Sequence, residues 1–258
     1  MKTILVIGIG AGNPEYITLQ AVKALNRVDV FFLMDKGSDK DALNLLRKDI
    51  CERYITDRHY RIVEALNPER QREGVAYRQA VNSLNSEKQH TFERLIAEEL
   101  VEGECGAFLV WGDPSLYDST MRILDAIIEG GRHALQYEVI PGITSVQALT
   151  ARHRTSLNHI GRSVEITTGR RLAESFPKNA DSVVVMLDAE NTYTSLQDQD
   201  LDIYWGAYLG TPDEILICGK LRDVAQEIER VRKAAREANG WIMDTYLLKR
   251  SRQDDFDR

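Results

Sequence analysis

A short apolar run, Gly106–Val110, leads directly into Trp111–Pro114, and this junction constrains the fold more than any other part of the sequence. A run of this length is typical of a buried strand, and apolar residues at helical spacing from Met121 onward predict a helix after the turn. Gly112 lets the backbone approach a ligand closely, and Pro114 restricts the turn. Strand, turn and helix in this order are typical of a ligand-binding turn at the carboxyl end of a strand in an α/β sheet. An ordinary connecting turn is the alternative.

The same order of apolar run, small-residue turn and helix recurs along the chain. Thr3–Ile9 and Leu135–Ile140 are predicted strands, and they lead into turns at 10–14 and 141–145. Further strands are expected at 164–168, 182–187, 201–208, 215–221 and 240–248, with an amphipathic helix at 224–238. The chain therefore belongs to the α/β class, and we predict two α/β domains, residues 1–141 and 142–258.

Local signals predict three finer details of the chain. Ser119 or Thr120 is expected to cap the helix that begins near Met121. A polar helix over residues 76–100 is expected to break near residues 84–86, and the charged tail from Lys249 onward is expected to fray.

Composition and charge narrow the possible functions. The chain has 258 residues, 43% apolar and 28% charged, as in an ordinary globular protein. Its formal net charge of −7 argues against a nucleic-acid partner, because phosphate contacts require a basic surface. The three widely spaced cysteines indicate neither a disulfide framework nor a metal site. No apolar run approaches the length of a membrane span, and Met1 leads directly into a strand, so we expect a cytoplasmic protein without a membrane partner.

Residues 152–171 are positively charged, unlike the chain as a whole. The segment contains five arginines and two histidines but a single acid, Glu165. Arginine pairs bidentately with carboxylates, so the segment is a candidate docking surface for a polycarboxylate. A solvated basic face is the alternative.

The first turn suggests a nicotinamide cofactor, but its spacing fails. Gly8 and Gly10 match the first two glycines of a dinucleotide-binding fingerprint, whereas Asn13 stands where the third glycine is required. A nicotinamide-dependent oxidoreductase is therefore an alternative that this position argues against.

Five motifs, in order and spread over nearly the whole chain, resemble the tetrapyrrole methylases, the S-adenosylmethionine-dependent enzymes of corrin and sirohaem biosynthesis. They are Gly8–Pro14, Gly112–Tyr117, Pro141–Ser145, Val184–Leu187 and Ala207–Glu214. Within the family, Leu109–Thr120, Ile166–Leu172, Tyr204–Tyr208 and Gly240–Tyr246 look most like the branch that removes an acetyl group. Asp118 and Asp188 depart from the broader pattern, in which glycine is usual, and both agree with that branch.

The resemblance implies two α/β domains that meet at a ligand cleft, usually in a homodimer, with S-adenosylmethionine bound between them. The positions that match the family's cofactor site are Ile9, Gly112, Asp113, Leu116, Thr144, Ser145, Leu187, Tyr208 and Leu209. Asp113 is a candidate acceptor for a ribose hydroxyl or for the ammonium group of the cofactor.

The resemblance also implies methylation of a ring carbon of precorrin-5, with release of its acetyl group as acetate. Removing the acetyl group requires a general base and donors for the developing oxyanion. We expect His153 or Asp118 to be the base, and Arg170 and Arg171 to bind substrate carboxylates. A surface role for His153 is the alternative. Methylation at another ring position and non-catalytic tetrapyrrole binding are the competing functions.

Overall fold

The computed structural model describes residues 1–35, 41–56, 59–66, 68 and 77–250, and it divides into two compact units. The first unit is Met1–Thr144 and the second is Ser145–Arg258. The boundary therefore falls within the turn that follows the strand at 135–140, just beyond the predicted position between residues 141 and 142. Within the described ranges, every helix is too short or too polar to cross a bilayer.

The sheet of the first unit has five parallel strands in the order β3-β2-β4-β1-β5. The strands are β1 (Lys2–Gly8), β2 (Val30–Asp35), β3 (Arg61–Leu66), β4 (Cys105–Val110) and β5 (Leu135–Ile140). Continuous burial along β1 and β4 is typical of a parallel sheet that is covered on both faces.

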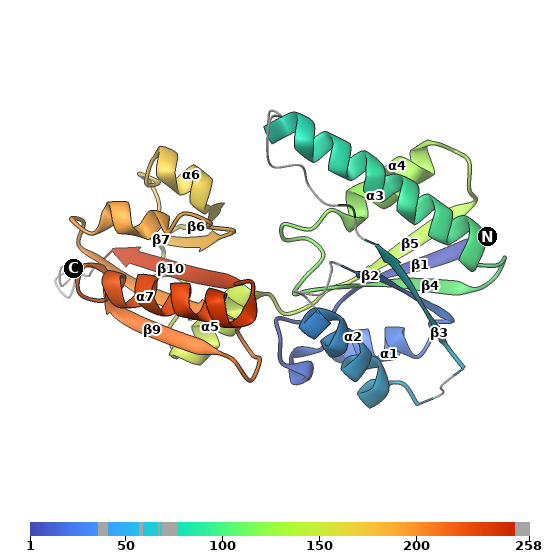
Figure 1. Cartoon of the computed structure of the whole chain (residues 1–258), viewed down its shortest axis with the longest axis horizontal. Helices are drawn as coiled ribbons and strands as arrows, with labels where there is room; N and C mark the ends of the chain where they lie inside the picture. Colours follow the sequence, from blue (N-terminus) through green and yellow to red (C-terminus); the bar gives the residue numbers. More distant parts are fainter. Residues whose placement is uncertain (36–40, 57–58, 67, 69–76, 251–258) are drawn as a thin grey trace. The chain divides into compact units, whose positions relative to one another are not determined.

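Helices cover the two faces of this sheet, as Figure 1 shows. The helices α1 (Leu19–Leu25) and α2 (Asp41–Tyr54) pack on one face, with Leu25 and Ile50 in a cluster around Ile7. The helices α3 (Tyr77–Glu99) and α4 (Thr120–Glu129) pack on the other, with Phe92 and Leu124 in a cluster around Val6. Because successive side chains of a strand point to opposite faces of a sheet, neighbouring residues of β1 contribute to different hydrophobic clusters.

Two local predictions for this unit are wrong. The helix α3 runs without the break expected at residues 84–86, because Asn and Ser weaken a helix only slightly and the packing of Phe92 and Ile96 outweighs that loss. Neither Ser119 nor Thr120 caps α4 through its side chain. Instead, the Thr120 N–H donates to Asp118 Oδ1 at 2.7 Å.

The strand order places a topological switch point between β1 and β4. The chain leaves β1 through α1 and enters β2, whereas it leaves β4 through α4 and enters β5, on the other side of β1. The two connections therefore run in opposite directions on opposite faces. Ligands of such sheets bind at the carboxyl ends of the strands at this point, where the turns after Gly8 and Val110 lie.

The second unit contains a mixed sheet in the order β6-β7-β10-β8-β9. The strands are β6 (Val164–Thr168), β7 (Ser182–Met186), β8 (Leu201–Ala207), β9 (Ile215–Lys220) and β10 (Asp244–Arg250). Only β6 and β7 pair in parallel, and β10 runs antiparallel to both β7 and β8. The recurring pattern predicted these strands but not their antiparallel pairing.

Helices and one buried lysine complete the second unit. The helix α7 (Leu221–Asn239) and the short helix α6 (Gly169–Glu174) contribute to the core that contains Trp205, while α5 (Ser145–His153) lies on the opposite face, with Leu149 against Gly206. The prediction of a frayed tail from Lys249 onward is wrong for Lys249 and Arg250, which lie in β10. Lys249 is 5% exposed and donates from Nζ to Thr155 Oγ1 at 3.1 Å. Residues 251–258 lie outside the described part.

Candidate functional site

Three turns meet backbone to backbone at the switch point of the first unit. Gly10 and Gly112 form an isolated antiparallel bridge, with Gly112 N–H donating to the Gly10 carbonyl at 2.8 Å. A Cβ added to Gly142 would lie 2.1 Å from the Gly112 oxygen, and one added to Gly8 would lie 2.6 Å from the Gly142 nitrogen. Gly8 and Gly142 are required because a side chain at either position would force the turns apart.

Asp113 fastens two of these turns together. Its Oδ2 accepts from the Gly142 N–H at 2.8 Å, and its Oδ1 accepts from the Ser115 N–H at 2.8 Å and from the Ser115 hydroxyl. Burial raises the pKa of the Asp113 carboxyl, but the bonds from Ser115 and Gly142 outweigh burial, and the pKa falls below its ordinary value. Three bonds within the chain leave this carboxylate charged and fixed, with lone pairs remaining for a ligand.

The first unit supplies five of the residues predicted to bind the cofactor. Gly112 has φ of 70°, and the Thr144 Cα would lie 3.6 Å from a Cβ added to it, so the turns after β4 and β5 are neighbours. Leu116 is half-buried just beyond Asp113. The Ile9 side chain is fully buried in the core, and its N–H donates to the Val110 carbonyl at 2.9 Å.

The second unit gathers the other four at one edge of its sheet. Because β10 is antiparallel to both neighbours, the ends of β7 and β8 lie on either side of its start, with Met186 opposite Thr245 and Ala207 opposite Asp244. Leu187, Tyr208 and Leu209 follow these strand ends directly. Ser145 reaches the same edge, because its hydroxyl lies 3.2 Å from Thr245 Oγ1.

Two of these residues have backbone in the left-handed region. Leu187 has φ of 55° and Tyr208 has φ of 50°, conformations that cost a non-glycine residue about 1–3 kcal/mol and that concentrate at functional sites. The Leu187 side chain is 67% exposed. The Tyr208 side chain is buried and its hydroxyl donates to the Trp241 carbonyl, so a ligand can reach this residue only through its backbone.

A buried network that sequence reasoning missed supports Leu187. Asp188 is 6% exposed and accepts from the Thr192 N–H at 2.7 Å and from the Tyr246 hydroxyl at 2.7 Å. Arg232 donates to the Asp188 carbonyl at 2.6 Å and forms a buried ion pair with Asp244 at 2.8 Å. One signal was present in the sequence: Arg232 falls on the stripe of α7 that otherwise carries buried apolar residues. Its partner could not be identified from that spacing.

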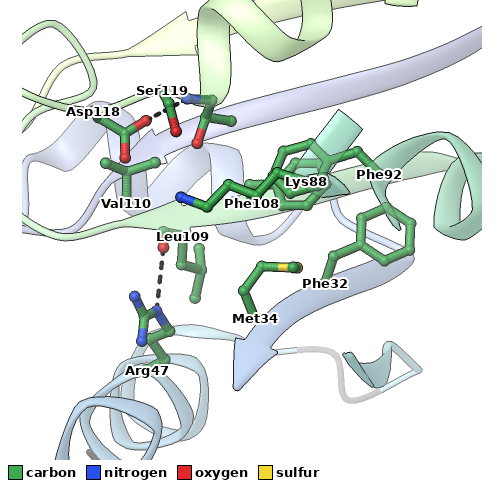
Figure 2. A pocket seen from close by; sticks show the side chains of 11 residues that line it. Phe32, Met34, Arg47, Lys88, Phe92, Phe108, Leu109, Val110, Asp118 and Ser119 are labelled. Carbon is green, nitrogen blue, oxygen red and sulfur yellow. Dashed lines mark hydrogen bonds between the residues drawn. The ribbon is translucent and has the colours of Figure 1, made fainter. Parts of the chain in front are cut away.

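A separate cavity of about 80 Å³ lies within the first unit, at the carboxyl ends of β2 and β4 (Figure 2). One side is apolar, with Phe92 stacked on Phe108 at a centroid distance of 4.1 Å. The other side carries charge, and Figure 2 shows the ammonium end of Lys88 directed away from the aromatic rings, to the side where Asp118 and Arg47 lie. The structure thus places the predicted base Asp118 in a cavity with two cations that the sequence did not single out.

Burial lowers the pKa of both cations of this cavity, Arg47 and Lys88. It lowers the pKa of the Arg47 guanidinium to about 10, although the charge of Asp118 opposes this shift. Burial also lowers the pKa of the Lys88 ammonium, with Asp118 opposing and Arg122 adding to the effect. Arg47 is held by a bond from Nε to the Leu109 carbonyl at 3.2 Å. No local pattern in the sequence indicates this cluster, because its members come from separate helices, strands and turns.

The structure places His153 at the end of α5 in the second unit, half-buried, with Nε2 at 2.9 Å from the Trp205 carbonyl. A carbonyl only accepts, so Nε2 carries the hydrogen and Nδ1 is the atom left to take a proton. Burial lowers the pKa of the His153 imidazole, opposed by the Trp205 carbonyl and by Glu214.

Acidic side chains neutralise part of the positive charge of residues 152–171. Arg152 pairs with Glu214 at 2.6 Å, and Arg162 pairs with Asp181 at 3.7 Å, through acids that come from outside the segment. Arg170 and Arg171 are exposed on α6, where Arg171 pairs with Glu174 at 2.9 Å. An anionic ligand would compete with that exposed pair at little cost.

The structure of the turn at residues 10–14 also differs from that of a dinucleotide-binding fingerprint. After Gly12 the chain enters the short 3-10 helix η1 (Pro14–Tyr16), which Asn13 caps by accepting from the Glu15 N–H at 2.9 Å. The long helix whose N-terminus would meet a pyrophosphate is therefore missing at this turn.

Comparison with known proteins defines the class. The family model of the tetrapyrrole (corrin/porphyrin) methylases matches residues 3–225, and the chain belongs to this family. It is thus an S-adenosylmethionine-dependent methyltransferase. Over 257 residues it is 51% identical to a precorrin-6A synthase (deacetylating) of Sinorhizobium sp, which covers 100% of this chain and 98% of the relative.

More distant relatives and solved structures agree with this class. A uroporphyrinogen-III C-methyltransferase of Methanocaldococcus jannaschii is 27% identical over 197 residues, 73% of this chain and 70% of that protein. The crystal structure of a cobalamin synthesis related protein (CobF) from Corynebacterium diphtheriae has a TM-score of 0.83 and 36% identity, over 96% of this chain and 98% of that one. The cobalt precorrin-4 methyltransferase CbiF, at 17% identity and a TM-score of 0.60 over 96% and 94% of the two chains, shares the fold.

Proposed function

We propose that the chain methylates ring carbon 1 of precorrin-5 and releases the acetyl group of the substrate as acetate, giving precorrin-6A. The observation that carries this proposal is the 51% identity, over the full chain, to a precorrin-6A synthase of the deacetylating kind. The chemistry of the two sites within the units supports it.

The residues at the strand ends fit S-adenosylmethionine. The glycine turns after β1, β4 and β5 offer backbone at a switch point, with the carboxylate of Asp113 beside them. Thr144 and Ser145 supply hydroxyls, and the exposed Leu187 supplies an apolar wall. When bound, the cofactor supplies an activated electrophilic methyl group, so orienting the ring carbon in line with it is the main task of these residues.

Acetyl removal needs a base, and we propose Asp118 for this role. Asp118 lines a cavity that also contains two cations, and the Thr120 N–H fixes its orientation. His153, the other candidate, has one ring nitrogen engaged with the Trp205 carbonyl and a pKa lowered by burial.

We further propose that Arg170 and Arg171 bind carboxylates of the tetrapyrrole. Both are exposed on α6, and guanidinium groups pair bidentately with carboxylates. Replacing both by alanine is expected to raise the KM for precorrin-5 about tenfold, with kcat little changed, because rim charges contribute to ground-state and transition-state binding equally. Arg230→Ala/Arg236→Ala, on the exposed side of α7, is the matched control. An unchanged KM in the α6 double variant would refute the assignment.

The proposed function is tested by calorimetric titration with S-adenosylhomocysteine, followed by turnover of precorrin-5 with separate measurement of acetate and of methylated product. We expect binding, and equal amounts of acetate and product. Asp113→Ala is expected to weaken binding at least tenfold, because it removes a charged acceptor and releases the Gly142 turn. Asp198→Ala, at an exposed aspartate of the second unit, is the control.

Each competing function predicts a different result in the same assay. Methyl transfer without acetate indicates methylation at another ring position, and tetrapyrrole binding without consumption of S-adenosylmethionine indicates a binding protein. We also propose that the enzyme is a cytoplasmic homodimer, which the family resemblance supports.

A further inference from the structure

The cavity between α2, α3 and the ends of β2 and β4 combines a small volume, an apolar wall and an excess of positive charge. We propose that this cavity receives the acetyl group of the substrate and that the Lys88 ammonium stabilises the oxyanion formed when water adds to the acetyl carbonyl. This inference rests on the proposed function, since it locates the deacetylation step within the first unit.

The size of the cavity suits an acyl group. A water molecule needs about 10–15 Å³ of such space, so the 80 Å³ present can hold a two-carbon acyl group together with water, whereas a tetrapyrrole ring is far larger. The stacked rings of Phe92 and Phe108, with Phe32 beside them, form a wall that suits a methyl group.

The charges of the cavity suit an anion. Arg47 and Lys88 are positive and Asp118 is negative, so together they carry a net charge of one positive unit. A tetrahedral oxyanion and the acetate formed from it each carry one negative charge. Such an anion would offset the desolvation of the Lys88 ammonium, and an electrostatic interaction of this kind is strong where water is excluded.

The Lys88 ammonium can move with the reacting oxygen more readily than the Arg47 guanidinium can. Arg47 is fastened by the Leu109 carbonyl and by Asn44 Oδ1, each at 3.2 Å. Among the described residues, no carboxylate lies within ion-pair distance of Lys88 Nζ, and the long lysine side chain can adjust its position.

The step balances with water as the only additional reactant. Asp118 takes a proton from water as the water oxygen bonds to the acetyl carbon, and the carbonyl oxygen becomes the oxyanion beside Lys88. The carbonyl then re-forms, the bond between the acetyl carbon and the ring carbon breaks, and its electron pair passes into the conjugated macrocycle. Acetic acid leaves and ionises to acetate.

The first test is single-turnover deacetylation of precorrin-5 by Lys88→Met, which keeps the length of the side chain but removes its charge. Loss of one oxyanion donor is expected to slow acetate release by about 10²–10³-fold. Lys88→Arg is expected to restore part of the rate, and Lys23→Met, at an exposed lysine of α1, to match the wild type. Affinity for S-adenosylhomocysteine and the thermal midpoint are expected to stay at wild-type values in all three.

The second test needs no turnover. Titration of the protein with sodium acetate, followed through broadening of the acetate methyl resonance, is expected to show saturable binding to the wild type and to Lys23→Met but not to Lys88→Met. The bulkier trimethylacetate is expected not to bind. Acetate release and acetate binding that persist in Lys88→Met would overturn the inference, while leaving wild-type turnover and the proposed function intact. Absence of acetate release in the wild type would instead reject the proposed function.

Discussion

Arg232→Met is expected to lower the free energy of unfolding of the second unit by about 3–5 kcal/mol, because it leaves the buried Asp244 carboxylate without its partner. Arg232 and Asp244 have side chains only 8% and 7% exposed, and their atoms lie 2.8 Å apart. The same substitution removes the bond to the Asp188 carbonyl. Urea denaturation followed by tryptophan fluorescence measures the effect, since Trp205 lies in the same core and bonds to Asp244 at 3.0 Å.

The same helix provides the control for this prediction. Arg222 of α7 pairs with Asp223 at 3.7 Å, but both side chains are 66% exposed, so Arg222→Met is expected to cost less than about 1 kcal/mol. The double variant Arg232→Met/Asp244→Asn is expected to recover part of the lost stability, because it removes the uncompensated charge while Trp205 keeps an acceptor. Equal stability of Arg222→Met and Arg232→Met would contradict the prediction.

This network matters for function as well as for stability. Asp188 follows Leu187 directly, and its bonds to Thr192, Tyr246 and Arg232 hold the turn in which Leu187 has left-handed backbone. The departure of Asp188 from the glycine usual in the family therefore has a structural reason here. The carboxylate fills the place beside Gly169, where any Cβ would lie 2.4 Å from Asp188 Oδ1.

Asp118→Asn is expected to slow acetate release from precorrin-5 by about 10²–10⁴-fold, the range that a positioned general base contributes. The amide oxygen of asparagine can still accept from the Thr120 N–H, so the start of α4 stays capped. Binding of S-adenosylhomocysteine is therefore expected to remain at the wild-type level. Rapid-quench measurement of acetate and calorimetric titration together separate chemistry from binding.

Asp125→Asn provides the matched control, since Asp125 lies on the same helix and accepts only a surface bond, from the Tyr137 hydroxyl at 2.6 Å. The competing assignment is tested by His153→Gln, whose amide N–H can still reach the Trp205 carbonyl. A loss of acetate release confined to His153→Gln would assign the base to His153 and would contradict the role of Asp118.

The sequence by itself determined the elements and the family. Apolar runs ending in small-residue turns predicted the strands at 135–140 and 164–168 with the observed bounds, because both buried apolar residues and turn glycines leave local signals. Five ordered motifs identified the tetrapyrrole methylases, and the family model and the relatives confirm that prediction. The local capping and helix-break predictions failed where packing and a neighbouring carboxylate outweighed weak propensities.

Only the tertiary structure decided which side chains act together. Arg232 and Asp244 pair because α7 packs against the sheet that contains β10, and Lys88, Asp118 and Arg47 meet because α3, the turn after β4 and α2 converge on one sheet edge. Such partners lie far apart in sequence, and the desolvation that lowers the pKa of Arg47 exists only once the chain is packed. The sequence shows which residues are charged, but only the folded chain determines how deeply each of them is buried and which residues it contacts.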